Sequence, residues 1–200
     1  MDFAVLASGN GSNLQAIINA AKKGKIRGKL KLVISDKADA RALERARKAG
    51  VPKVLFVDPK GFPSREDYDD ELVSILRKEK VGLVVLAGFM RILSPVFIRA
   101  FRYKVINVHP ALLPAFKGGH AVKDSLAYGV RVTGVTVHFV DEQVDHGAII
   151  AQGAVEVKPK DTVETLSKRI HKMEHVLYPK VVDNFLRGKY KVSGRIVRMK

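Results

Sequence analysis

The feature that most constrains the fold is the regular alternation of short apolar runs with amphipathic segments in the first half of the chain. The apolar runs predict strands, which lie at residues 3–8, 29–35, 53–58, 82–88 and 104–109. The segments between them have helical periodicity and predict helices at residues 12–25, 40–50, 64–80 and 95–102. Ser64 and Asp67 have the spacing of a capping box at the start of the third helix. Strands that are almost continuously apolar belong to parallel sheets covered on both faces.

The pattern changes after residue 110. Residues 120–129 predict a helix, residues 131–140 and 148–157 predict strands, residues 161–188 predict a long amphipathic helix, and residues 189–199 predict a terminal hairpin turning at Ser193 and Gly194. Pro179 should kink the long helix or start a new one. The predicted class is therefore α/β, with an open, mostly parallel twisted sheet, a Rossmann-like N-terminal half and a mixed C-terminal half.

Size and composition predict one domain, residues 1–200, with a division into two halves near residue 100. The chain has 46% hydrophobic residues, no apolar run of membrane-spanning length and no signal-peptide pattern at its start. We therefore expect a cytoplasmic protein that does not contact a membrane. Cysteine is absent, which excludes disulfides, thiolate nucleophiles and cysteine-ligated zinc.

The formal net charge of +16 predicts a surface that attracts anions, such as phosphorylated metabolites, acidic cofactors or nucleic acid. Nucleic-acid binders usually concentrate their charge on one helix, arm or aromatic platform. Here the lysines and arginines are scattered along the chain. A solvated basic surface is the better interpretation, and we expect no nucleic-acid partner.

The segment SGNGSN, residues 8–13, lies between the first predicted strand and the first predicted helix. Glycines at this position expose backbone N–H groups, and the helix dipole favours a phosphate there. The segment is neither a dinucleotide fingerprint nor a Walker loop. From these residues alone, a phosphate-binding loop and a plain turn capped by serine are equally supported.

Asn107 and His109 lie two residues apart at the carboxyl end of the fifth predicted strand, so their side chains share one face. A lone histidine here would usually be structural. The neighbouring amide and the stiff segment bracketed by Pro110 and Pro114 favour function instead. The two side chains suit stabilisation of an oxyanion and acid-base chemistry.

A third candidate is VDEQVDHGAII, residues 140–150, in which Asp145 precedes His146 and Gly147. An aspartate that reaches a histidine raises its pKa and favours imidazolium near neutral pH. The spacing matches no metal-binding motif, so we expect no metal. The remaining histidines are weaker candidates. His120 follows a glycine pair in a loop expected over the crevice, and His138 alternates with Val137 and Phe139 in a predicted strand. His171 and His175 are interpreted as surface or packing residues.

Five segments spread over nearly the whole chain carry a family resemblance: SGNGSNLQAII, SDKADARALERARKAG, VVLAGFMRILSP, INVHPALLPAF and GVTVHFVDEQVDHGAIIAQ. Together they resemble the phosphoribosylglycinamide formyltransferases, folate-dependent enzymes of purine biosynthesis. The last segment is the most specific, because nine residues have the family's signature spacing: Gly134, Thr136, Phe139, Val140, Glu142, Val144, Asp145, Gly147 and Ile150.

The resemblance implies transfer of the formyl group of 10-formyltetrahydrofolate to the amine of phosphoribosylglycinamide, without a metal. It implies a phosphate-binding half, residues 1–100, and a catalytic and folate-binding half, residues 101–200. The implied catalytic residues are Asn107, His109 and Asp145; phosphate and ribose would contact Gly11, Ser12, Asn13 and Glu174; folate would contact Arg65, Met90, Arg91, Ile92, Leu93, Asn107, Val140, Asp141 and Asp145. A monomer or weak homodimer is expected.

The chain departs from the family pattern at two positions. Lys117 follows Phe116 where the family often has proline, and Val122 replaces a common histidine. Two related enzymes remain alternatives: a formyltetrahydrofolate hydrolase usually has a regulatory domain and lacks the GNGSN loop, and a methionyl-tRNA formyltransferase needs a further RNA-binding domain. A basic nucleic-acid-binding module would explain the charge but not the Asn107, His109 and Asp145 arrangement.

Overall fold

The computed structural model describes residues 1–200 and confirms the predicted α/β class. Its main sheet has seven strands in the order β3-β2-β1-β4-β5-β6-β7. The first five strands pair in parallel and are β1 (Asp2–Leu6), β2 (Leu30–Ser35), β3 (Lys53–Phe56), β4 (Val81–Leu86) and β5 (Val105–His109). The last two, β6 (Val132–Phe139) and β7 (Ile149–Glu156), pair antiparallel, as expected of a mixed C-terminal half.

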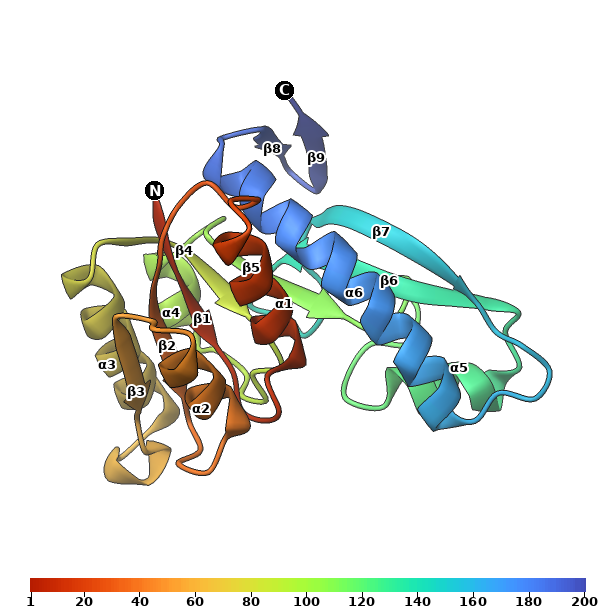
Figure 1. Cartoon of the computed structure of the whole chain (residues 1–200), viewed down its shortest axis with the longest axis horizontal. Coiled ribbons are helices and arrows are strands. Elements are labelled where there is room, and N and C mark those ends of the chain that lie inside the picture. Colours follow the sequence, from red (N-terminus) through yellow and green to blue (C-terminus); the bar gives the residue numbers. More distant parts are fainter.

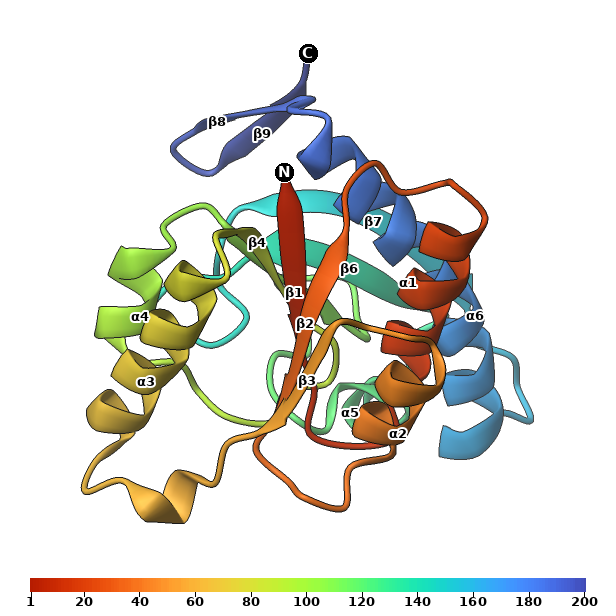
Figure 2. The ribbon, with the colours of Figure 1, turned by 60° about the vertical axis from the view of Figure 1, so that its left-hand side comes forward.

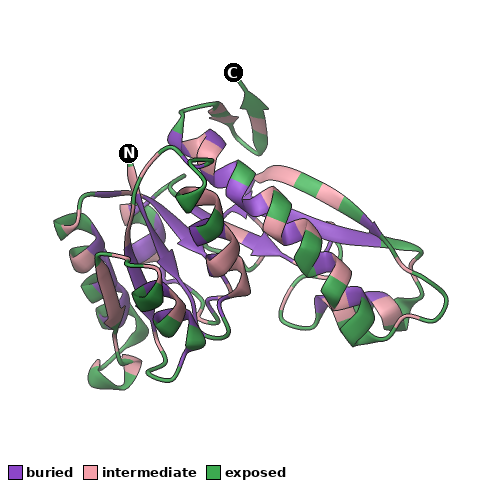
Figure 3. Ribbon diagram, in the orientation of Figure 1, coloured by how far each residue is buried: buried purple, intermediate pink, exposed green.

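Helices cover both faces of this sheet (Figures 1 and 2). One face carries α1 (Ser12–Lys22), α2 (Arg41–Lys48) and α6 (Val163–Leu186), and the other carries the short 3₁₀ helix η1 (Pro59–Gly61) with α3 (Arg65–Lys78) and α4 (Pro95–Ala100). The remaining helix, α5 (Ala121–Tyr128), packs against α6. Buried residues follow the central strands and the inner sides of the helices (Figure 3). No helix is both long and apolar enough to span a membrane.

The predicted cap of α3 is confirmed, because the Ser64 hydroxyl accepts a hydrogen bond of 3.1 Å from the backbone N–H of Asp67. Of the two outcomes predicted for Pro179, the start of a new helix is excluded, because α6 runs from Val163 to Leu186 without a break. Proline removes one helical hydrogen bond. Burial of Tyr178 and Val182 in the core holds the helix together across that point.

The chain ends in a two-stranded hairpin, β8 (Tyr190–Ser193) and β9 (Ile196–Met199), outside the main sheet (Figure 1). Its turn is at Gly194 and Arg195, one residue later than predicted. The Arg195 Nη2 atom donates a hydrogen bond of 2.8 Å to the carbonyl oxygen of His146. The hairpin therefore contacts the loop that follows β6.

The carboxyl ends of β1, β4 and β5 meet at one edge of the sheet. The backbone N–H of Ser8, just after β1, donates to the carbonyl of Gly88, just after β4, at 3.0 Å. Leu86 of β4 pairs with Asn107 of β5, which pairs in turn with His138 of β6. Ligand sites of open α/β sheets lie at such an edge, and the sequence candidates converge here.

Candidate active site

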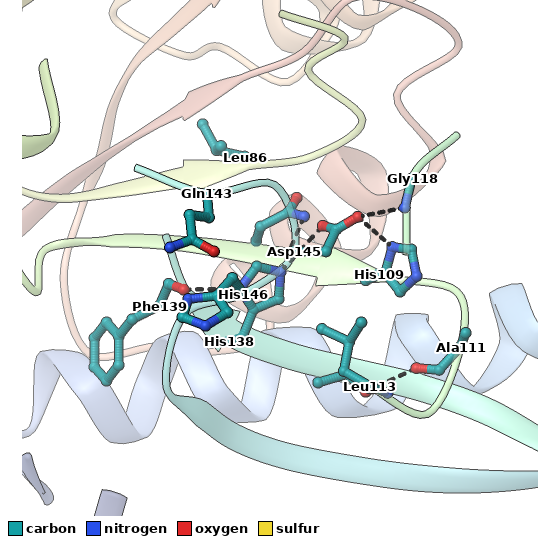
Figure 4. Close-up of polar contacts among 12 residues, drawn as sticks. Leu86, His109, Ala111, Leu113, Gly118, His138, Phe139, Gln143, Asp145 and His146 are labelled. Carbon is teal, nitrogen blue, oxygen red and sulfur yellow. Dashed lines mark hydrogen bonds and ion pairs between the residues drawn. The ribbon is translucent and has the colours of Figure 1, made fainter. Parts of the chain in front are cut away.

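Asp145 lies between two histidines at the carboxyl end of β5 (Figure 4). Its Oδ2 atom is 3.2 Å from His109 Nδ1, and its Oδ1 atom is 3.5 Å from His138 Nε2. The backbone N–H of Gly118 donates to Oδ2 at 2.9 Å. Asp145 has a positive φ of 47°, a conformation uncommon for residues other than glycine. A loop in this strained conformation presents the carboxylate to both histidines.

His138 was only a weaker candidate in the sequence, and the structure brings it into contact with Asn107 and Asp145. Its Nε2 atom is 3.3 Å from the Asn107 amide nitrogen, and its Nδ1 atom is 2.7 Å from the carbonyl oxygen of Phe139. Since Nδ1 faces a carbonyl acceptor, the neutral ring carries its proton there and leaves Nε2 to accept from Asn107. The sequence holds a signal for this: Thr136 and His138 alternate with apolar residues, as Asn107 and His109 do on the paired strand.

The electrostatics of His109 also differ from the expectation of a raised pKa. Its side chain is almost completely buried, and this burial lowers its pKa. The charge of Asp145 and a hydrogen bond to the Phe116 carbonyl act in the opposite direction without overcoming it. Desolvation of the buried ring therefore outweighs the attraction of the aspartate and holds the pKa of His109 below its ordinary value.

Asp145 itself stays ionised. Burial raises the pKa of its carboxyl, but its contact with His138, the hydrogen bond from the Gly118 N–H and the electrostatic attraction of the two imidazoles outweigh burial and lower the pKa to about 2. The site therefore holds a buried carboxylate at neutral pH. Its hydrogen bonds point it at the histidines and not at solvent.

The segment between Pro110 and Pro114 is held by hydrogen bonds from β6 and β7. These hydrogen bonds add to the stiffness that the two prolines provide. The Thr136 hydroxyl donates to the Ala111 carbonyl at 2.7 Å and accepts from the Leu113 N–H at 3.0 Å (Figure 4). Gln152 donates to the Leu113 carbonyl at 3.0 Å. Further along, the Phe116 carbonyl is 2.7 Å from His109 Nε2. The loop therefore engages the ring nitrogen of His109 that does not face Asp145.

The GNGSN loop has the geometry of an anion site. Gly11 has φ of 72°, and a Cβ atom there would lie 2.9 Å from the Cα of Ala42, so only glycine fits. The loop leads into the N-terminus of α1, which has no acidic residue in its first turn. Backbone N–H groups and the helix dipole favour a phosphate at such an end.

Asn13 and Glu174 meet across the interface between α1 and α6. The Asn13 amide nitrogen donates to a carboxylate oxygen of Glu174 at 2.8 Å, and Glu174 is only 4% exposed. Burial raises the pKa of Glu174, and the Asn13 hydrogen bond and the charge of His171 offset this only in part. The Asn13 Oδ1 atom is buried without a partner. Both side chains retain capacity for a further hydrogen bond.

A cavity of about 500 Å³ opens beside Asp145, within the size range of small-molecule sites. It is lined by nearly all the residues that the resemblance assigns to folate and catalysis: Met90, Arg91, Ile92, Leu93, Asn107, His109, Val140, Asp141 and Asp145. The backbone N–H of Met90 donates to the Ser8 hydroxyl at 2.8 Å, which links the cavity to the start of the GNGSN loop. Met90 and Ile92 are 74% and 57% exposed, so they are not core residues.

Of the residues that the resemblance assigns to folate, Arg65 alone does not line this cavity. It begins α3, and its guanidinium pairs with Glu66 at 3.0 Å. Gly11, Ser12, Asn13 and Glu174 are also absent from the lining and lie at the interface of α1 and α6. No group of three or more His, Asp or Glu side chains is arranged to hold a metal ion.

A mostly parallel sheet with a glycine-rich loop after β1 and an Asn-His-Asp cluster after β5 and β6 is the architecture of a formyl-transferring enzyme, and the comparisons agree. The chain belongs to the formyl transferase family, which matches residues 1–182. It is 44% identical to phosphoribosylglycinamide formyltransferase of Escherichia coli over 96% of this chain and 90% of that protein, and 43% identical to the Bacillus subtilis enzyme over 92% and 94%.

Longer relatives contain a similar segment. The chain is 48% identical to the trifunctional purine biosynthetic protein adenosine-3 of Gallus gallus, but it spans only 19% of that protein's length. Among solved structures, glycinamide ribonucleotide transformylase 1 of Symbiobacterium toebii superposes with a TM-score of 0.97 at 46% identity, covering 100% of this chain and 93% of that one. The whole fold, including the terminal hairpin, is therefore shared with this transformylase.

Proposed function

We propose that this protein transfers the formyl group of 10-formyltetrahydrofolate to the amine of phosphoribosylglycinamide in purine biosynthesis. The observation that carries the proposal is the ionised Asp145 between His109 and His138, beside Asn107 and the cavity. Family membership and the similarity to named formyltransferases support it. We propose a cytoplasmic location and a monomer or weak homodimer.

The two substrates approach Asp145 from different directions in this proposal. Folate enters the 500 Å³ cavity, with its pterin between residues 90–93 and residues 140–145. The backbone groups of these segments supply most of its hydrogen bonds. Arg65 lies outside the cavity lining, so we assign it to the acidic tail of folate, which extends out of the cavity.

The ribotide binds on the other side, at the interface of α1 and α6. Its phosphate accepts hydrogen bonds from the backbone of Gly11, Ser12 and Asn13 at the helix N-terminus. Glu174 receives the ribose hydroxyls. The support for this role is its burial beside the unpartnered Asn13 Oδ1, which leaves donors and acceptors for a sugar.

The chemical step is an attack of the glycinamide amine on the formyl carbon. A new carbon-nitrogen bond forms, the bond to folate N10 breaks, and the proton lost by the amine passes to N10. Negative charge develops on the formyl oxygen during the attack, and Asn107 and His109 donate hydrogen bonds to it. A buried dipole or N–H group directed at this charge stabilises the transition state far more than the same group would in water.

The Nε2 atom of His109 lies 2.7 Å from the Phe116 carbonyl and therefore carries a proton. We propose that substrate displaces this carbonyl and that the Nε2–H group donates to the formyl oxygen instead. The charges of Asp145, which faces Nδ1, and of the developing oxyanion both favour a protonated ring. The ring takes up a proton at Nδ1 from solvent as the oxyanion forms and releases it when the bond to N10 breaks.

The test is a transfer assay with phosphoribosylglycinamide and 10-formyltetrahydrofolate, followed through the absorbance of the folate product. The proposal expects folate deformylation that depends on the ribotide and yields formylglycinamide ribotide in equal amount. Deformylation without ribotide, with release of formate, would instead identify a hydrolase. No reaction with either acceptor would reject both.

A further inference from the structure

A groove of about 730 Å³, separate from the cavity beside Asp145, lies between α1 and α6. These two helices run side by side, with α2 beyond α1 (Figure 1). The groove starts at Ser12, the first residue of α1, and extends to Lys23, just beyond its end. Its volume is that of a small-molecule site.

The groove is strongly cationic. Four of its lining residues are Lys23, Lys25, Arg45 and Lys180. Asp183 is the single acidic residue in the lining, and both of its oxygens are already occupied, Oδ1 by the backbone N–H of Arg27 at 2.8 Å and Oδ2 by Arg187 Nε at 2.7 Å.

None of the four cations has a carboxylate partner. Concave surfaces that gather one sign of charge concentrate counter-ions. A buried, unpartnered His175 Nε2 atom in the same lining adds a further site for a hydrogen bond.

A smaller hollow of about 220 Å³ adjoins the groove and shares Gln15 and Arg45 with it. Three further cations line this hollow, against the single acid Glu44: Lys22, Arg41 and Lys48. The excess positive charge therefore extends over α1 and α2. The N-terminus of α1, which favours anions, lies at the Ser12 end of the groove.

We propose that the groove is a second anion site, for a compact ligand that carries two or more linked phosphates, such as pyrophosphate or the phosphate chain of a nucleotide. The charge requires a polyanion, and the volume restricts its size. Apart from His175, the lining has no aromatic ring on which a base could stack. The phosphate chain is therefore the part recognised, which argues against single-stranded nucleic acid, since its binding proteins use stacking platforms.

Arg45 connects this groove to the phosphate loop, residues 8–13, which we propose binds the phosphate of the ribotide. Its Nε atom donates to the carbonyl of Asn10 at 2.8 Å, Nη2 donates to Asn10 Oδ1 at 3.3 Å, and Nη1 donates to Gln15 Oε1 at 3.2 Å. All these acceptors are neutral. Because hydrogen bonds to a charged acceptor are stronger, a polyphosphate can displace them from Arg45. Loss of the Asn10 contacts loosens the loop that binds the ribotide, so the second anion raises the KM for ribotide.

The binding test uses inorganic pyrophosphate, ADP and AMP with the full-length protein in calorimetry at low ionic strength. Wild-type protein should bind pyrophosphate and ADP, with AMP weaker. K23Q/K180Q should lose about tenfold in pyrophosphate affinity. K78Q/K104Q, which removes the same charge from exposed positions around α3 and α4, is the matched control and should bind as wild type does.

The kinetic test rests on the proposed function, whereas the binding test does not. Pyrophosphate should raise the KM for ribotide several-fold and leave the KM for folate unchanged. K23Q/K180Q should have normal kinetics without pyrophosphate and lose this sensitivity. Equal inhibition of the two proteins would mean that pyrophosphate occupies only the phosphate loop, and equal affinity for it in calorimetry would mean that the groove is not a site.

Discussion

Two loops reach the crevice at the carboxyl edge of the sheet, and they are held there by different means. The phosphate loop, residues 8–13, is fixed by its own glycine and by nearby α2, through the 3.1 Å hydrogen bond from the Ala42 N–H to the Gly9 carbonyl and the contacts of Arg45. The aspartate loop, residues 140–148, is held by His138 of the strand that precedes it and by two more distant segments that contribute Gly118 and Arg195.

The first loop is the one we propose for substrate binding, and the second is the one we propose for catalysis. The phosphate loop takes its turn from its own glycine and can be recognised as a motif, although Arg45, 35 residues further on, also holds it through Asn10. A loop defined by distant contacts brings together groups that no single segment contains. The predictions below test whether the two loops differ as described.

The largest effect is expected at Gly147 in the aspartate loop. A Cβ atom there would lie 1.8 Å from the carbonyl oxygen of Phe139, a contact with backbone that no rotamer relieves. Gly147→Ala should reduce the free energy of unfolding by about 4 kcal/mol or more. It should also abolish transfer. Urea unfolding followed by circular dichroism measures the first, and the transfer assay the second.

Gly11→Ala is the matched change in the phosphate loop. Its Cβ atom would meet Ala42 at 2.9 Å, in a backbone conformation with φ of 72°. The cost should be smaller, about 1–2 kcal/mol, with the main loss in ribotide binding. If Gly11→Ala proved as destabilising as Gly147→Ala, the two loops would not differ in the way proposed.

Asp145→Asn should lower kcat about 10²- to 10⁴-fold with little change in either KM, because it removes the charge that stabilises a developing imidazolium at His109. Steady-state kinetics with each substrate varied in turn measures this. Asp141→Asn is the control in the same loop. Asp141 pairs with His146 at 2.8 Å and lines the cavity, so its loss should raise the KM for folate more than it lowers kcat.

Local sequence was sufficient to place residues 8–13 at the end of β1 and Asn107 with His109 at the end of β5, because each is a feature of one strand end. It was insufficient for His138, whose role depends on the antiparallel pairing that places it opposite Asn107. Strand register between segments 31 residues apart is not encoded in either segment alone.

The direction of the pKa shift of His109 was mispredicted for a related reason. A neighbouring aspartate is visible in a motif, but the depth of burial is a property of the whole fold. At 3% exposure, desolvation of His109 dominates over the attraction of Asp145. The Phe116 carbonyl and the Gly118 N–H were also not predicted, because backbone groups leave no signal in the identity of a residue.

Asp145 and Glu174 should change the stability of the protein in opposite directions as the pH changes. Asp145 has a folded-state pKa of about 2, below its ordinary 3.8, so its stabilisation is present above pH 3.8 and is lost as pH falls towards 2. Asp145→Asn should therefore cost about 2 kcal/mol at pH 7. Most of this difference should disappear near pH 2, as measured by urea unfolding at each pH.

Glu174 should show the opposite dependence. Burial raises its pKa above 4.5, so the unfolded chain ionises first as pH rises, and stability falls with increasing pH. Glu174→Gln should thus be more stable than wild type at pH 7 and similar to it below pH 4, while binding ribotide less well. A Glu174→Gln protein that is less stable at pH 7 would contradict the assignment.

The smallest effect is expected at Arg195, the most distant support of the aspartate loop. Its single strong contact is with the His146 carbonyl, on an exposed hairpin, so Arg195→Ala should cost less than about 1 kcal/mol of stability. Because His146 follows Asp145 directly, the loop should still loosen: hydrogen exchange at residues 141–147 should speed up and kcat should fall about two- to fivefold. Arg198→Ala, on the neighbouring strand, removes the same charge without this contact. If the two variants had the same hydrogen-exchange rates and the same kcat, the hairpin would not contribute to holding the aspartate loop. The loop would then be held only by Gly118 and His138.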